Sequence, residues 1–257
     1  MKFDHIRSVS AIALVLTALS FGGCAGGARP LMPTPVLYRQ PGGSELFSNT
    51  PAQRRTTELT LLYITNRGLE SNPGSPVPYG QSRARSLAFG SAVVELVPDL
   101  DWPSLRRQSQ LAERTMPVNL KLGSVEELGR FPEEPYALEL APAGVSRSSS
   151  VLRRHQETKA GFQAQLQRRL ERSPSKEVIL YVHGFNQDFA AAAYTTAELC
   201  HFFGREDVCA FFTWPASTSG NLLTSYTATT ESAEYSVGHL RKMIRTIAET
   251  PGVEGIE

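Results

Sequence analysis

The sequence lacks the features that would indicate a nucleic-acid, nucleotide or metal partner. Its 26 Lys and Arg residues are balanced by 25 Asp and Glu residues, so no net positive field exists to hold a phosphate backbone. It contains no G-x-x-x-x-G-K or G-x-G-x-x-G loop, no C-x-x-C pair, and no paired histidines or carboxylates at metal-ligand spacing. We therefore expect no nucleic-acid partner, no cofactor and no metal.

Cysteine is scarce as well, and the first of the three cysteines follows an export signal. Basic residues precede an apolar run over residues 9–19, which is shorter than the roughly 20 residues that a membrane-spanning helix needs. The run leads into Leu-Ser-Phe-Gly-Gly-Cys, which resembles a bacterial lipobox with lipidation at Cys24, although the phenylalanine departs from the usual pattern. The alternative is an ordinary signal cut after Ala25. With residues 1–23 as signal peptide, we expect a bacterial cell-envelope protein, either lipid-anchored on the outer-membrane or periplasmic side, or periplasmic or secreted.

The other two cysteines, Cys200 and Cys209, lie nine positions apart. After export they enter an oxidising compartment, where a disulfide between them is possible. The alternative is a pair of buried free thiols at a helix end and a strand start. The residues alone leave both readings open.

Proline and glycine divide the exported chain into two parts. Residues 24–55 are rich in both and hold few apolar side chains, which favours a flexible tether. Residues 56–257 have the composition of a folded domain. The tether is expected to join the membrane anchor to this domain.

The hydrophobic pattern of the domain predicts alternating strands and helices. A continuous apolar run over residues 177–182, closed by a glycine, is typical of a strand buried on both faces of a parallel sheet. Apolar residues at helical spacing predict an amphipathic helix over 151–172. The other expected strands are 57–65, 89–97, 136–140, 208–213 and one beginning near 253; the other helices are 189–203 and 230–249, and 68–86 is expected to be a loop. This order predicts an α/β fold with a parallel sheet and flanking helices.

His183, Gly184, Phe185 and Asn186 follow the central strand and form the most informative motif. Ligands of open α/β sheets bind beyond the carboxyl ends of the strands, so a site is expected at this loop. Its backbone N–H groups can stabilise the oxyanion that forms when a nucleophile attacks a carbonyl. His183 is expected to hold the loop rather than to transfer protons. The alternative is a plain strand end with a glycine stop.

The motif resembles the oxyanion loop of α/β-hydrolases, and the chain is similar to a little-characterised esterase- or lipase-like family of that superfamily. The resemblance rests on four segments: YITNR at 63–67, RSLAFG at 85–90, YVHGFN at 181–186 and FTWP at 212–215. It implies that Phe185 and Asn186 form the oxyanion hole, with His183 and Gly184 as support. It also implies that Trp214 and Pro215 line the pocket, and that the substrate is an ester-type small molecule or lipid.

The sequence departs from this family at the nucleophile. An α/β-hydrolase carries its serine on G-x-S-x-G, in a tight turn after the strand that follows the last predicted helix, and this motif is absent from the chain. Near misses at 80–84 and 144–148 precede the oxyanion loop and are expected to be loop sequence. His201 and His239 fall in predicted helices and are not expected to act as the base. The hydrolase sheet is therefore expected to be incomplete, and the alternative function is that of a non-catalytic envelope lipoprotein that binds or assembles.

A fluorophosphonate probe tests this reading of the nucleophile. Because such probes report an activated serine, and the elbow that activates it is missing, the purified 257-residue chain should show no labelling above a heat-denatured control. Stoichiometric labelling of one serine, located by mass spectrometry, would contradict the prediction.

Overall fold

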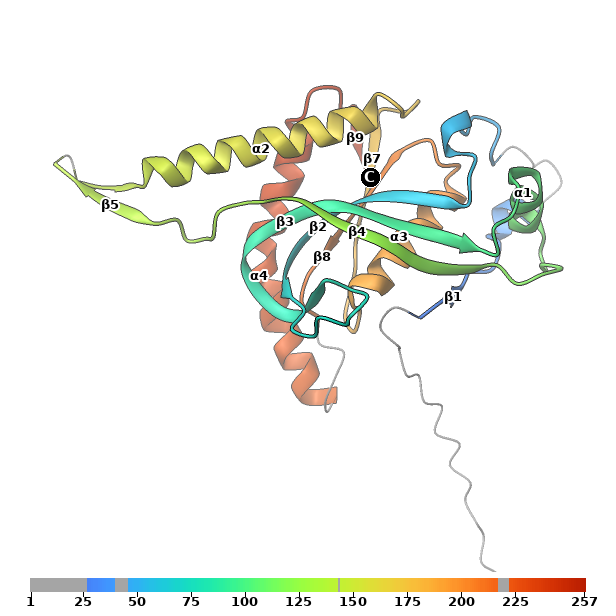
Figure 1. The fold of residues 1–257 in the computed structure, drawn as a ribbon, viewed down its shortest axis with the longest axis horizontal. Helices are drawn as coiled ribbons and strands as arrows, with labels where there is room; N and C mark the ends of the chain where they lie inside the picture. Colours follow the sequence, from blue (N-terminus) through green and yellow to red (C-terminus); the bar gives the residue numbers. More distant parts are fainter. Residues whose placement is uncertain (1–26, 40–45, 143, 217–221) are drawn as a thin grey trace, which may run out of the picture.

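The computed structural model describes residues 27–39, 46–142, 144–216 and 222–257. The predicted signal peptide (1–23) and Cys24 lie outside these residues. A seven-stranded sheet, flanked by helices, forms the centre of the domain (Figure 1). Its strands are β1 (Arg29–Pro30), β2 (Glu58–Leu69), β3 (Tyr79–Val97), β4 (Asn119–Arg130), β7 (Glu177–Val182), β8 (Val208–Thr213) and β9 (Gly255–Ile256). The helices are α1 (Trp102–Gln110), α2 (Ser149–Leu170), α3 (Phe189–Phe202) and α4 (Leu222–Ala248).

The sheet is half antiparallel and half parallel, in the order β1-β4-β3-β2-β8-β7-β9. The first four strands pair antiparallel, whereas β2, β8, β7 and β9 run parallel. The strand expected near residue 253 is β9, an edge strand that pairs with β7 through Val178 and Ile256, so β7 is the second strand from this edge. The expected α/β sheet with flanking helices is thus confirmed, with an antiparallel extension that the pattern did not indicate.

The core lies in two layers, one on each face of the sheet. Side chains alternate along a strand, so Tyr63 of β2 points to one layer and Ile64 to the other. The first layer packs against α3 through Phe189, and the second against α2 and α4 through Phe162 and Met243. Helices lie on both faces of the parallel strands, and β8 is buried along its whole length, whereas β7 becomes half-buried and then exposed toward Val182.

Strands replace much of the loop expected over 68–86. β2 runs to Leu69 and β3 begins at Tyr79, so the two strands form one long hairpin. The near-miss serine motif at 80–84 lies in β3, and residues 144–147 of the second form β6 (Gly144–Arg147), paired with β5 (Leu138–Ala141). The expectation of loop sequence was wrong at both places, because cross-strand pairing outweighs the polar composition. Neither motif places its middle serine in a strand-to-helix turn, because Ser82 lies within β3 and Ser146 within β6.

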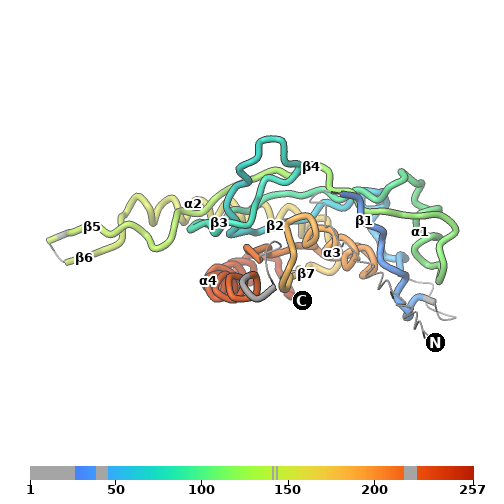
Figure 2. Tube along the Cα trace, turned by 90° about the horizontal axis from the view of Figure 1, so that it is seen from below, coloured from blue at the N-terminus to red at the C-terminus, as the bar shows by residue number. Residues whose placement is uncertain are grey.

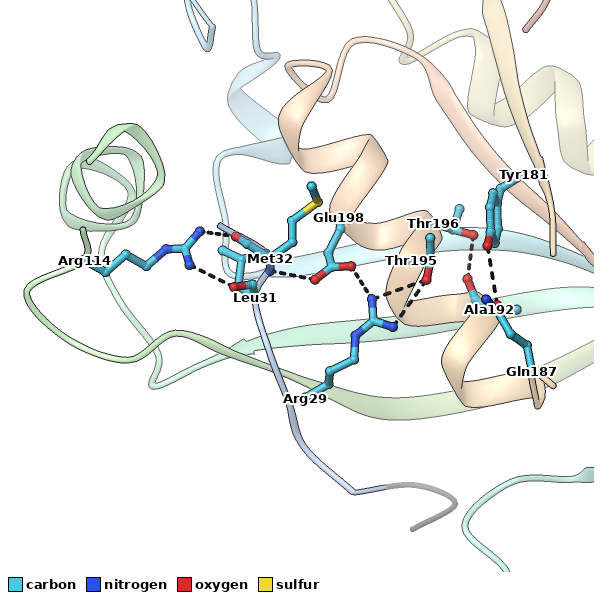
Figure 3. Close-up of polar contacts among 10 residues, drawn as sticks. All are labelled: Arg29, Leu31, Met32, Arg114, Tyr181, Gln187, Ala192, Thr195, Thr196 and Glu198. Carbon is cyan, nitrogen blue, oxygen red and sulfur yellow. Dashed lines mark hydrogen bonds and ion pairs between the residues drawn. The ribbon is translucent and has the colours of Figure 1, made fainter. Parts of the chain in front are cut away.

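Residues 27–39 and 46–55, expected to belong to a flexible tether, pack against the domain. Arg29 forms an ion pair with Glu198 of α3, and the backbone N–H of Met32 donates to the same carboxylate at 2.7 Å (Figure 3). Leu31 and Phe47 are buried in the body of the domain. The tether prediction was wrong for these stretches, because a few well-placed apolar anchors and one buried acceptor suffice to fix a proline-rich segment.

A disulfide joins Cys200, in the last turn of α3, to Cys209 of β8, with their Cα atoms 5.9 Å apart. This arrangement corresponds to the first of the two readings of the cysteine pair. The bond ties the helix end to the strand that follows it.

Two features of the outline complete the description. The small β5–β6 hairpin and the start of α2 project away from the body of the sheet (Figure 2). None of the helices in the described ranges is both long and apolar enough to cross a membrane.

Phe162 provides a test of the inner face of α2. Its side chain is fully buried and meets Phe89 edge to face, with ring centroids 5.2 Å apart. Phe162→Ala should lower the free energy of unfolding by about 3–5 kcal/mol, because it removes apolar contacts and leaves a cavity. Leu152→Ala, on the same helix at a side chain 38% exposed, should cost about 1 kcal/mol or less. Equal losses in urea unfolding would show that the two faces were assigned wrongly.

Candidate functional site

The sequence-predicted site residues lie in the loop between β7 and α3. Val182 ends the strand, and Asp188 caps α3 by accepting a hydrogen bond from the backbone N–H of Ala191 at 2.7 Å. The neighbouring strand β8 ends beside this loop, where Thr213 is followed by Trp214. The parallel pairing therefore brings the two predicted segments together at the carboxyl edge of the sheet.

His183 anchors the loop from beneath. Its side chain is 2% exposed and stacks on Trp214, with ring centroids 5.2 Å apart and planes inclined by 7°. The indole N–H of Trp214 donates to the carbonyl oxygen of His183 at 2.9 Å. Trp214 and Pro215 are both buried and therefore support the loop from the side of the core. Their role as pocket walls stays a prediction.

The hydrogen bonds of His183 define one neutral form of its ring. Nε2 accepts from the backbone N–H of Trp214 at 3.1 Å, so Nδ1 carries the hydrogen and donates to the carbonyl oxygen of Gly184 at 2.8 Å. Burial is the main cause that lowers the pKa of His183 to about 4, and the nearby Arg67 charge adds to it. A neutral ring with both nitrogens engaged is suited to holding the loop.

Arg67, near the end of β2, fixes this arrangement, although no role was predicted for it. Its side chain is fully buried, and Nε donates to the hydroxyl of Thr213 at 2.8 Å. Nη2 donates to the carbonyl oxygen of Gln187 at 2.7 Å, and Nη1 to that of Gly80 at 3.1 Å. Burial lowers the pKa of Arg67 to about 10, whereas the charge of Asp188 acts in the opposite direction. The guanidinium thus joins three segments behind the loop.

One signal in the sequence pointed to Arg67. Three consecutive polar residues, Thr65, Asn66 and Arg67, follow the apolar run 61–64 of β2, and all three are buried. A buried polar group requires hydrogen-bond partners, so such a cluster at a strand end indicates a built site. Thr213 gave no such signal, because a single threonine at a strand end is ordinary.

The outer part of the loop faces solvent. Gly184, Phe185 and Asn186 are exposed, with Phe185 at 40%. The left-handed residue of the turn is Asn186, with φ of 57°, and not Gly184 as a glycine turn would require. A Cβ added at Gly184 meets no atom within 4 Å. The turn therefore does not require a glycine at position 184. The missing side chain instead leaves open space in front of the loop.

The amides of this turn are available to a ligand. Among the described residues, no hydrogen bond uses the backbone N–H of Phe185 or Asn186 as donor. The loop leads directly into the N-terminus of α3, a helix of 14 residues, whose dipole favours negative charge there. Two free donors beside a helix N-terminus can bind a carboxylate, a phosphate or a developing oxyanion.

Apolar side chains border these amides. Val182 is 39% exposed, and the ring of Phe185 lies 6.2 Å from that of Tyr226 on α4. We call the exposed side chains of Val182, Phe185 and Tyr226, which lie at the strand end, in the loop and on α4, the apolar strip. The larger cavities of the described residues, of about 640 and 540 Å³, lie elsewhere.

In the described residues, His201 and His239 form no hydrogen bond with the β7–α3 loop. His201 is buried in α3 and contacts Ser109 and Arg205, whereas His239 in α4 lies 3.2 Å from the side-chain amide of Asn66. Both are in helices, as expected, and burial lowers the pKa of each. Within the described part of the chain, no cluster of three potential metal ligands occurs.

Comparison with known proteins gives one match. The family model described as "Alpha/beta hydrolase of unknown function (DUF900)" matches residues 158–257. The matched segment contains β7, the loop, α3, β8, α4 and β9, together with the later part of α2. Neither the curated proteins nor the solved structures gave a match.

The protonation of His183 can be measured directly. Because burial opposes the charged ring, its ¹⁵N signals should keep the Nδ1–H pattern from about pH 8 to about pH 5. The folded pKa of about 4 lies below the ordinary value of 6.5, so the unfolded chain binds more protons between them. Stability is therefore lost as the pH falls through this window, and His183→Asn should remove that part of the loss. A ring that titrates near pH 6.5 would disprove the assignment.

Proposed function

Residues 158–257 match the model of a family of α/β hydrolases of unknown function, and from this premise we propose that the β7–α3 loop is an oxyanion-binding site for acyl substrates. The observation that carries the proposal is the pair of unengaged amides at Phe185 and Asn186, exposed above a fully bonded, buried support. Such a pair stabilises the charge that develops on a carbonyl oxygen under attack. The function is that of an esterase- or lipase-like hydrolase domain.

The rigid hydrogen-bonded residues behind the loop favour a catalytic role over nonspecific anion binding. An oxyanion hole is effective when its donors need no reorganisation during the reaction. Here the loop is fixed by Arg67 at Gln187 and by the Nδ1–H of His183 at Gly184. The donors therefore stand ready before a ligand arrives.

The apolar strip supports an acyl substrate rather than a small inorganic anion. Val182, Phe185 and Tyr226 offer exposed carbon surface beside the amides. A ligand with a carbonyl or carboxylate head and a hydrocarbon tail satisfies both surfaces. This chemistry corresponds to an ester-type small molecule or a lipid.

A non-catalytic role has one specific observation in its favour. The 257 residues hold no G-x-S-x-G, and the serine near misses lie in strands β3 and β6. The proposal therefore assigns the oxyanion loop to this chain, and no nucleophile. A chain that binds acyl ligands without turnover would fit the binding role expected of an envelope lipoprotein.

The place of action is proposed from the N-terminal sequence. The apolar run at 9–19 and the lipobox-like segment ending at Cys24 favour a lipid-anchored protein of the bacterial envelope. A lipid substrate would lie near such an anchor. Metabolic labelling with a palmitate analogue tests this, because Cys24→Ser should abolish the label if the anchor is there.

Gly184→Val tests the acyl site. NMR titration of the purified chain with monomethyl hexylphosphonate, a tetrahedral monoanion with an alkyl tail, should shift the amide signals of Phe185 and Asn186. The added side chain occupies the open space over the loop and should weaken binding at least about tenfold, or about 1.4 kcal/mol. Because a Cβ there meets nothing, the thermal midpoint should stay within about 2 °C of that of the parent chain.

Gly161→Ala is the matched control, since it also adds a Cβ in open space, on α2 far from the loop. It should bind like the parent. If the phosphonate shifts other residues and leaves 185 and 186 unchanged, the oxyanion assignment is wrong. If hexanol binds as tightly as the phosphonate, the apolar strip alone provides the binding energy and the amides contribute none.

A further inference from the structure

A second concave site lies at the other end of the parallel strands. A cavity of about 540 Å³ is bordered by the starts of β2 and β8, near Leu59 and Val208, and by the C-terminal part of α2. Parallel strands start at one edge of a sheet and end at the other, so this cavity lies across the sheet from the β7–α3 loop. It is independent of the acyl site proposed above.

The cavity is lined by an unusual number of cations. Five arginines border it, against three acidic residues. The arginines are Arg54, Arg168, Arg169, Arg172 and Arg205; the acids are Glu58, Glu126 and Asp207. The lining therefore carries net positive charge in a chain that as a whole is nearly neutral.

Two of these arginines already have structural roles. Arg54 donates to the carbonyl oxygens of Arg205 and Asp207. Arg205 is buried and donates to the carbonyl oxygens of Arg54 and Thr56. These contacts hold the segment before β2 against the turn between α3 and β8.

The three arginines of α2 and the turn after it have no such partners. In the described part of the chain, no ion pair or side-chain hydrogen bond engages Arg168, Arg169 or Arg172. The Nε of Arg169 is moreover buried and has no acceptor. Its pKa is lowered by burial first and then by the charges of Arg168, Arg172 and Arg54, with no acid compensating.

The helix dipole alone does not account for this cluster. Cations are favoured at the C-terminus of a helix, which suits Arg168 on the outer surface of α2. The dipole, however, supplies no acceptor to a guanidinium N–H buried at the rim of a cavity. Buried donors normally have partners, so an orphan beside neighbouring cations indicates a missing acceptor.

We propose that this cavity, which we call the arginine cavity, binds a phosphate group through Arg168, Arg169 and Arg172. Guanidinium groups match the oxygens of phosphate with paired, charge-assisted hydrogen bonds, and three of them surround a tetrahedral anion well. A volume of about 540 Å³ lies within the range of small-molecule sites. Leu59, Leu128 and Val208 give the cavity apolar wall for the body of the ligand. The ligand is a phosphomonoester or a phospholipid headgroup.

Isothermal titration of the purified chain at constant ionic strength tests the site. Inorganic phosphate and glycerol 3-phosphate should bind saturably, and chloride at the same ionic strength should not compete. Arg169→Gln and Arg172→Gln should each weaken binding about tenfold or more. Arg153→Gln removes an exposed charge from the same helix outside the cavity and should leave binding unchanged.

The thermal midpoint gives a second readout. Arg169→Gln should raise the thermal midpoint of the ligand-free chain, because it removes repulsion between neighbouring arginines. It should also reduce the rise in midpoint that phosphate produces.

Sedimentation with vesicles of phosphatidylcholine containing phosphatidylglycerol separates the two sources of the phosphate. Binding to the anionic vesicles alone assigns a lipid headgroup, and binding to glycerol 3-phosphate assigns a soluble ligand. No binding to either, or equal loss with Arg153→Gln, would overturn the proposal.

Discussion

The buried charge of Arg67 is the constraint on which the carboxyl edge of the sheet depends. A guanidinium placed in the core must find acceptors for its donors, because an unpaired buried charge is costly. Those acceptors come from Gly80 on β3, Thr213 on β8 and Gln187 in the loop. One side chain on β2 therefore sets the relative position of three segments that are far apart in the sequence.

This constraint explains why the loop has two distinct sides. Its inner side is fully engaged, with His183 neutral, stacked on Trp214 and bonded through both ring nitrogens. Its outer side is formed by the exposed residues Phe185 and Asn186, whose amides donate no hydrogen bond within the described residues. A fixed base beneath free donors is the arrangement that binding of a developing negative charge requires. The arginine cavity at the opposite edge differs from the loop, because its free donors belong to side chains and not to the backbone.

Much of the parallel half could be predicted because buried strands have a clear signature. The apolar runs at β7 and β8, and the helix α3 between them, were found nearly to the residue, whereas α4 begins at Leu222 and not at the expected residue 230. The antiparallel half was harder: β4 has exposed and half-buried residues, and α1 begins with Trp102-Pro103 in a polar stretch, so neither gave a periodic pattern. The packing of Leu31 and Phe47 was missed because it depends on long-range partners such as Glu198.

The sequence by itself determined an α/β chain, a helix after His183-Gly184-Phe185-Asn186 and the absence of a serine elbow, since these follow from local composition and order. Only the tertiary structure decided that Arg67 lies behind the loop, that Asn186 rather than Gly184 makes its turn, and that three arginines of α2 and its following turn border one cavity. The reason is physical. Burial and hydrogen-bond partners belong to the assembled sheet, where residues more than a hundred positions apart meet, and no local pattern records which of them do.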